Sequence, residues 1–144
     1  MGLKVELKPR ERLIVGESLI TNGNQRTRLL IAGDAPILRE KDIMTPREAD
    51  TPAKRIYLAV QLMYTSRDPR MHYDSYFALL RELVQAAPSA WSHVADISNH
   101  IMAGEMYKAL KCARKLIAYE KELIDHAARG KDLRRDRGAN RKSA

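Results

Sequence analysis

The sequence predicts an α+β protein with a small N-terminal antiparallel five-stranded sheet, a four-helix amphipathic region and a basic tail. Apolar and charged residues alternate from Leu3 to Lys8, which is typical of a strand with one solvated face. After Pro52 the apolar residues recur with helical spacing instead. The last fifteen residues contain six Lys and Arg against two Asp and Glu, with Leu133 as their only large apolar side chain. We therefore divide the chain into a β-rich part (1–50), a helical part (51–129) and a disordered basic tail (130–144).

Turn residues delimit the five predicted strands. Pro9 ends the first strand, and Gly16 separates two short apolar runs as the tip of a tight hairpin. Asn22-Gly23-Asn24 is a strong turn signal, because Asn and Gly tolerate the positive φ of primed turns. The strands are expected at 3–8, 13–15, 18–20, 25–32 and 37–43.

Helix starts and breaks are equally clear in the second part. Thr51 is a good N-cap, and Pro52 suits the first helical position, where its missing N–H leaves nothing unpaired. Proline or glycine separates each pair of successive helices. The helices are expected at 52–66, 71–87, 89–103 and 105–128, and the last should end at Gly130.

Length and composition limit the class of protein. With 144 residues and 31% charged residues, the chain has room for one compact domain. No apolar run approaches the roughly 20 residues of a membrane-spanning helix, so we expect no membrane partner. The N-terminus lacks the apolar core of a signal peptide, and Cys112 is the only cysteine. We therefore expect a cytoplasmic protein.

The chain lacks the motifs of common catalytic sites, namely a P-loop, a dinucleotide-binding fingerprint and a G-x-S-x-G nucleophile elbow. Cys112 and His126 would lie about 21 Å apart along one helix, too far to form a catalytic pair. We expect neither an enzyme nor a cofactor. His93, Asp96 and His100 share a helical face and could hold a divalent metal, but a solvated polar stripe is the interpretation we favour.

Basic side chains on the predicted sheet are the best candidates for a binding site. Alternation places Arg26 and Arg28 on one strand face, and Arg39 and Lys41 on one face of the last strand. Such charges either solvate the outer surface of a sheet or bind RNA. No aromatic residue precedes Tyr57, so RNA binding here would use guanidinium and main-chain groups in place of base stacking. The candidate RNA-binding residues are Arg26, Arg28, Arg39, Lys4, Lys8 and Lys41, with phosphate contacts added by the tail at 131–142.

The third and fourth predicted helices contain more large apolar residues than one core stripe requires. These residues either pack the helices against the rest of the chain or form an exposed groove for a protein partner. The candidate partner-binding residues are Trp91, Met102, Met106 and Tyr107, with Ile97 beside them.

Part of the β-rich region resembles the carbon-storage regulator CsrA. The resemblance lies in the order of Gly23-Asn24-Gln25, Ala35-Pro36 and Arg39-Glu40, which leads into Ile43. It implies an intertwined dimer of five-stranded chains that binds single-stranded mRNA loops, with Arg39 at the place of the essential arginine. Short strands also leave unpaired edges that proteins rarely expose. We therefore expect a homodimer with strand edges at its interface.

A second resemblance extends over nearly the whole chain. The motifs Glu11-Arg12-Leu13-Ile14-Val15, Ile43-Met44-Thr45-Pro46, Thr51-Pro52-Ala53-Lys54-Arg55-Ile56-Tyr57 and Gly104-Glu105-Met106-Tyr107-Lys108-Ala109-Leu110-Lys111 are similar to those of the FlbT family. These proteins regulate flagellum biosynthesis in alphaproteobacteria. The resemblance implies association with the 5′ untranslated leader of flagellin mRNA and promotion of its degradation, although some members act positively. It also implies a connection with flagellin and the helical protein FlaF. The alternative function is therefore a flagellin- or FlaF-binding chaperone or adaptor that acts through the helical half.

Overall fold

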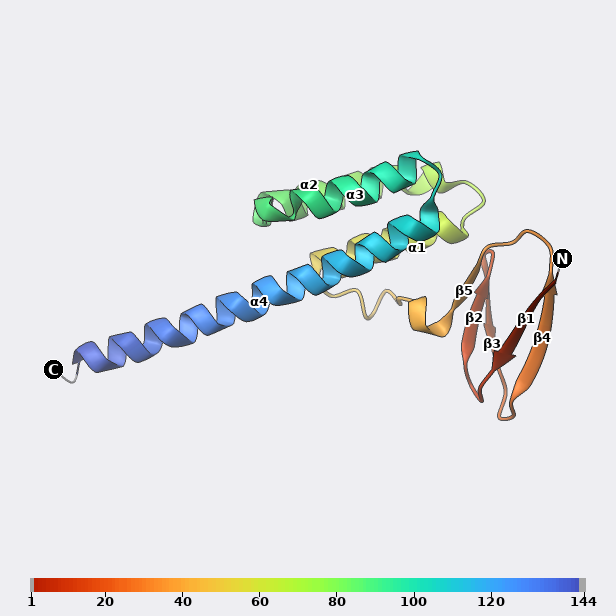
Figure 1. Ribbon diagram of the computed structural model, residues 1–144, viewed down its shortest axis with the longest axis horizontal. Coiled ribbons are helices and arrows are strands. Elements are labelled where there is room, and N and C mark those ends of the chain that lie inside the picture. Colours follow the sequence, from red (N-terminus) through yellow and green to blue (C-terminus); the bar gives the residue numbers. More distant parts are fainter. Residues whose placement is uncertain (1, 143–144) are drawn as a thin grey trace.

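The computed structural model describes the backbone of residues 2–142 and the side chains of residues 2–130. It confirms the α+β class, with antiparallel strands first and helices after them (Figure 1). The strands are β1 Gly2–Leu7, β2 Arg12–Val15, β3 Ser18–Thr21, β4 Thr27–Ala32 and β5 Ile37–Arg39.

The strands form two small sheets where one five-stranded sheet was expected. β1 pairs with β4, while β2 lies between β3 and β5. Alternation directs one apolar face of each sheet toward the other sheet, and these faces pack together around Val5, Leu7 and Leu13. Two sheets therefore bury side chains that one open sheet of this size would leave exposed to water.

Two strand ends show how local sequence and tertiary contacts compete. The expected hairpin joins β2 to β3 through Gly16, which has a φ of 59°, a conformation that glycine adopts without strain. The last strand, however, ends at Arg39 rather than residue 43. Its expected continuation forms the 3-10 helix η1 (Glu40–Asp42), because Asp42 is buried against the helical half.

The helical half begins where the sequence predicts. The Thr51 hydroxyl accepts a hydrogen bond from the Lys54 N–H at 3.2 Å and caps α1. The first residues of the second and third predicted helices belong instead to short 3-10 helices that begin at Pro69 and Pro88. α4 continues beyond Gly130, which was wrongly expected to end it. The elements are α1 Pro52–Thr65, η2 Pro69–His72, α2 Tyr73–Ala86, η3 Pro88–Ala90, α3 Trp91–Met102 and α4 Met106–Lys142.

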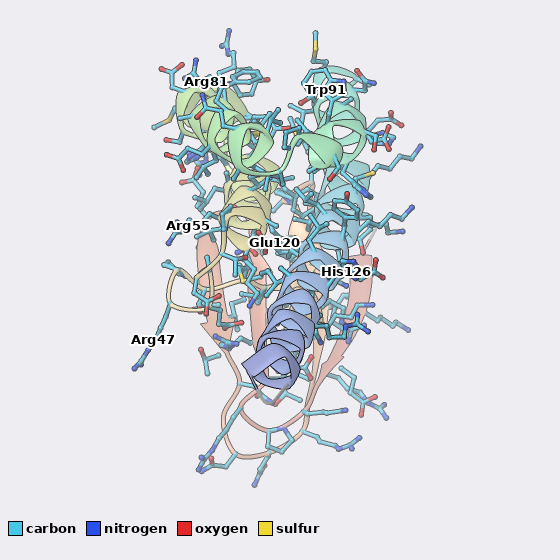
Figure 2. All side chains as sticks on the ribbon, turned by 90° about the vertical axis from the view of Figure 1, so that its left-hand side faces the viewer. Arg47, Arg55, Arg81, Trp91, Glu120 and His126 are labelled. Carbon is cyan, nitrogen blue, oxygen red and sulfur yellow. The ribbon has the colours of Figure 1, made fainter. Side chains whose placement is uncertain are left out.

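The four helices enclose the main core. α1 and α4 lie side by side next to the strands, and α2 and α3 form the outer layer, where Arg81 and Trp91 are labelled (Figure 2). Fully buried residues of this core include Ile56, Met63 and Ile97, and Leu38 of β5 joins the same cluster. The strand half is therefore attached to the helical core through its last strand.

None of the helices in the described part of the chain has both the length and the apolar composition that crossing a lipid bilayer demands.

Candidate nucleic-acid interface

A groove of about 710 Å³ lies where β1 and the end of β5 approach each other. Its basic lining residues are Lys8, Arg10, Arg39 and Lys41. Its acidic lining residues are Glu6, Glu11 and Glu40. We call this feature the junction groove. It unites three of the six predicted RNA-binding residues and adds Arg10, which the sequence interpretation missed.

Arg39 connects the two sheets at this groove. The residue pairs with Leu13 in the β5–β2 ladder and so lies on the sheet face that packs toward β1. Its Nη2 donates a hydrogen bond to the main-chain oxygen of Glu6 at 3.3 Å. This contact uses one edge of the guanidinium, and the exposed side chain keeps its other N–H groups available for a ligand.

The turn that presents Lys8 and Arg10 is held by a neighbouring asparagine. The Asn22 side-chain amide donates to the main-chain oxygens of Lys8 at 2.8 Å and Gln25 at 2.9 Å. Arg10 has a φ of 64°, which is strained for a residue with a Cβ, and its N–H donates to the Gly23 oxygen at 2.8 Å. The turn is therefore pinned in a conformation that the isolated sequence would not favour.

Two acidic residues of the groove are already engaged within the protein. Glu40 forms an ion pair with Arg12 at 3.1 Å, and Glu11 accepts a hydrogen bond from the main-chain N–H of Lys8 at 2.9 Å. These contacts satisfy the carboxylates locally. Because Arg12 offsets the charge of Glu40, an anionic ligand would meet Lys8, Arg39 and Lys41 with less repulsion than three free carboxylates would cause.

The other three predicted RNA-binding residues form a separate group. Lys4 and Arg28 lie on the outer face of the β1–β4 sheet, next to Glu6 and Leu30. Arg26 precedes β4, and its Nη1 lies 3.5 Å from the Glu6 carboxylate. The predicted surface is thus divided between an outer face and the junction groove, with Glu6 at their border.

The candidate partner-binding residues do not form one surface. Trp91 is 62% exposed and lines an apolar groove between α2 and α3 with Phe77, which is 48% exposed. Met102 is 85% exposed at the other end of α3. Met106 packs partly against the main core, and the Tyr107 ring lies 5.9 Å from that of Tyr64. Ile97 is fully buried in the core.

The two histidines of α3 that were considered as metal ligands contact other side chains. The His93 ring lies 4.8 Å from the Tyr119 ring, and His100 Nδ1 lies 3.3 Å from the Glu105 carboxylate. Among the residues that the structure describes, no cluster of three or more His, Cys, Asp or Glu side chains could hold a metal ion.

A partly buried polar cluster joins the strand half to α1 and α4. Arg114 Nη2 donates to the Asp42 carboxylate, to the Lys41 main-chain oxygen at 3.2 Å and to the Tyr57 hydroxyl at 3.1 Å. The Tyr57 hydroxyl donates to the Asp42 main-chain oxygen at 2.6 Å, and burial raises its pKa. We call Asp42, Tyr57 and Arg114 the junction cluster. It fixes η1, and with it Lys41, against the helices.

Comparison with known proteins reveals close relatives. A sequence model described as "Flagellar protein FlbT" matches residues 3–124. A "Probable flagellum biosynthesis repressor protein FlbT 1" of Bradyrhizobium diazoefficiens is 60% identical over 85% of each chain. A "Probable flagellum biosynthesis repressor protein FlbT" of Rhodopseudomonas palustris is 52% identical over 86% of this chain and 98% of its own length. The "Flagellum biosynthesis repressor protein FlbT" of Caulobacter vibrioides is 38% identical over 96% of this chain and its own full length. No solved structure gave a significant match. The match to the family model and the extent of these identities show that the chain belongs to the FlbT family.

Proposed function

We propose that this protein represses flagellum biosynthesis by binding the 5′ untranslated leader of flagellin mRNA at the junction groove and promoting degradation of that mRNA. Its relatives are named as flagellum biosynthesis repressors, which supports the regulatory role. The observation that supports RNA as the ligand is the convergence of Lys8, Arg10, Arg39 and Lys41 in one groove.

The basic side chains of the groove suit the phosphates and base edges of RNA. The guanidinium of Arg39 can meet a phosphate or a guanine edge with two hydrogen bonds, whereas Lys8 and Lys41 act as flexible point charges for phosphates. Lys4, Arg26 and Arg28 on the outer sheet face would contact the RNA further along its backbone. The tail at 131–142 lies outside the residues whose side chains are described, and its contribution stays a prediction.

Replacement of Arg39 tests the site. Arg39→Ala should weaken binding to a flagellin leader RNA by about 1–3 kcal/mol, measured by fluorescence anisotropy. Arg39→Lys, which keeps the charge but loses the planar fork, should recover only the phosphate part of the affinity. Arg81→Ala on α2 is the matched control, because this exposed arginine lies in the outer helical layer (Figure 2). Equal leader affinity of wild type and Arg39→Ala would refute the site.

Deletion of 131–144 separates specific from general binding. The truncated protein should lose affinity for leader and unrelated RNAs alike, and its affinity should depend less steeply on salt.

In cells, a chain with Arg39→Ala should lengthen the half-life of flagellin mRNA relative to wild type. An unchanged half-life alongside weakened binding would separate leader binding from the degradation step.

The exposed groove between α2 and α3 supports a second candidate function, an adaptor for flagellin or FlaF. Phe77 and Trp91 expose large aromatic surface there, and such residues are common anchors in protein interfaces. The test is co-purification with wild type and Trp91→Ala from a nuclease-treated lysate. A complex with flagellin or FlaF that survives nuclease and requires Trp91 would support the adaptor, whereas loss of the complex on nuclease treatment would favour RNA.

We also propose a homodimer that uses the unpaired strand edges. β3 is an edge strand with all four residues exposed, including Leu19 and Ile20. Sedimentation in high salt without RNA should give twice the chain mass, and a species near 16.4 kDa would reject the dimer.

A further inference from the structure

We propose that a nucleotide-binding subsite lies beside the junction groove, where Tyr107 of α4 stacks on an RNA base and Lys41 and Lys111 contact the adjoining phosphates. This inference rests on the proposed RNA-binding function and extends it from the strands onto α4. It gives the chain an aromatic platform that the strand half itself lacks.

The subsite is a pocket of about 190 Å³ between η1 and α4. Its lining residues are Lys41, Asp42, Tyr57, Tyr107, Leu110, Lys111 and Arg114. Lys41 also lines the junction groove, so the two concave features adjoin. A single strand leaving the groove past Lys41 would therefore reach Tyr107 next.

The charge of this pocket is strongly positive. Its one acidic residue, Asp42, is buried and occupied by Arg114 in the junction cluster. Among residues 2–130, neither Lys41 nor Lys111 forms an ion pair with a carboxylate. Both lysines are exposed, so their ammonium groups are available to an anionic ligand.

Tyr107 has the surroundings of a stacking residue. Its side chain is 38% exposed, and the Tyr64 ring packs 5.9 Å away and supports it. Lys111 Nζ lies 5.0 Å from the Tyr107 ring centroid, a cation–π contact formed one helical turn along α4. A base that stacks on this ring would displace the lysine, and the flexible side chain would then reach the neighbouring phosphate.

The combination of groups favours a nucleic acid over an acidic peptide. Carboxylates could pair with Lys41 and Lys111, but they would gain nothing from stacking on the Tyr107 ring. A nucleotide uses both features, since every base has a π face and every nucleotide a phosphate. Lys41 also links the ring to a groove that already contains Arg39 and Lys8.

Three variants of the full chain separate stacking from folding. Tyr107→Ala should weaken affinity for a single-stranded flagellin leader RNA roughly 5- to 100-fold, the range expected for one stacked base. Tyr107→Phe keeps the ring and should bind within about twofold of wild type. Tyr119→Ala is the matched control, because it removes a tyrosine ring that packs beside His93 further along α4 and does not line the pocket, and it should leave RNA affinity unchanged. Circular dichroism of each variant checks that the helices remain intact.

The phosphate contact predicts a specific salt effect. Lys111→Ala should reduce the slope of log affinity against log salt by about 1, because one fewer phosphate is neutralised. Lys115→Ala is the matched control, since this exposed lysine lies one turn further along α4 and does not line the pocket. Equal slopes for wild type and Lys111→Ala would remove Lys111 from the subsite.

Photocrosslinking provides a readout that a merely structural role would not change. A leader RNA substituted with 5-iodouridine should crosslink to Tyr107 in the wild type and lose that adduct in Tyr107→Ala.

RNA binding that depends on Arg39 but is unaffected by Tyr107→Ala would overturn this inference and leave the proposed function intact. Absence of leader binding by the wild type would overturn both. Competition by polyglutamate as strong as competition by RNA would indicate an acidic protein and also reject the subsite.

Discussion

The two halves of this chain are stabilised to very different degrees. The helical half buries seventeen of its own residues, together with Leu38 of β5, in one continuous core. The strand half has a separate core of only Val5, Leu7 and Leu13, with four partly buried neighbours. Small sheets of this kind are rarely stable alone, so the strands depend on their attachment to the helices. Most of the polar residues proposed to bind RNA lie on the half that contributes less to stability, whereas Tyr107 and Lys111 lie on α4.

The largest expected effect compares one core residue from each half. Ile97→Ala and Leu13→Ala both truncate a fully buried side chain, and each should cost about 2–5 kcal/mol locally. Ile97→Ala should lower the stability of the whole chain in urea unfolding followed by circular dichroism. Leu13→Ala should release the strands first, which hydrogen exchange would detect as lost protection in β1–β5 while the helices stay protected. A uniform loss of protection in both variants would show that the halves unfold as one unit.

The next effect tests the junction cluster. Arg114→Ala leaves the buried Asp42 carboxylate without its cation and should destabilise the chain by about 1–3 kcal/mol. The Arg114 side chain is half-exposed, so water offsets part of the loss. Adding Asp42→Asn should recover part of the stability, and a double-mutant cycle in urea measures the coupling. Additive effects of the two substitutions would mean that the ion pair does not connect the halves.

Alkaline pH should weaken the helical half specifically. Burial raises the pKa of Tyr76 to about 12, while its hydroxyl stays within 2.9 Å of Ser98 Oγ. Because the folded-state pKa exceeds the ordinary value of 10.0, this contribution is complete below pH 10 and is lost as pH rises toward 12. The free energy of unfolding should fall by about 2 kcal/mol over that interval. Tyr76→Phe should show a shallower decline, and an identical decline would exclude Tyr76 as its source.

The smallest effect concerns the first turn of α1. Thr51→Ala removes the hydroxyl that accepts the Lys54 N–H and should cost about 1 kcal/mol in thermal unfolding. Thr51→Ser retains the oxygen and should stay close to wild type. A loss of equal size in Thr51→Ser would indicate that the methyl group, not the cap, stabilises the helix start.

Much of the fold could be predicted from local sequence because local chemistry decides it. Gly16 permits the β2–β3 hairpin, and Thr51-Pro52 starts α1 at the predicted residue. The division into two sheets could not be predicted in this way, since it depends on which strands pair over long distances. The end of β5 at Arg39 depends on burial of Asp42 by Arg114, a residue 72 positions away. Local sequence predicted that the last helix ends at Gly130, but α4 continues through that residue.

The candidate site was predictable only in part, for the same physical reason. Strand alternation grouped Arg26 with Arg28 and Arg39 with Lys41, but Arg26 precedes β4, and Lys41 lies in η1 beyond the end of β5. Arg10 was missed because its place in the groove results from a strained turn held by Asn22 and Gly23. The sequence interpretation placed Tyr107 among the partner-binding candidates because the last two helices contain more large apolar residues than one core stripe requires. Tyr107 and Lys111 are separated by one helical turn, and this spacing in the sequence predicts the cation–π contact between them.

The position of Leu38 in the helical core has a consequence for synthesis on the ribosome. β1 to β5 emerge first, but Leu38 packs in a cluster that includes Ala109 and Leu110, and η1 requires Arg114. The earliest segments of the nascent chain therefore obtain their final contacts only after the first turns of α4 have been translated. A ribosome that stalls before residue 114 would display strands whose junction groove is still incomplete. Translation through the start of α4 thus precedes formation of the complete basic groove.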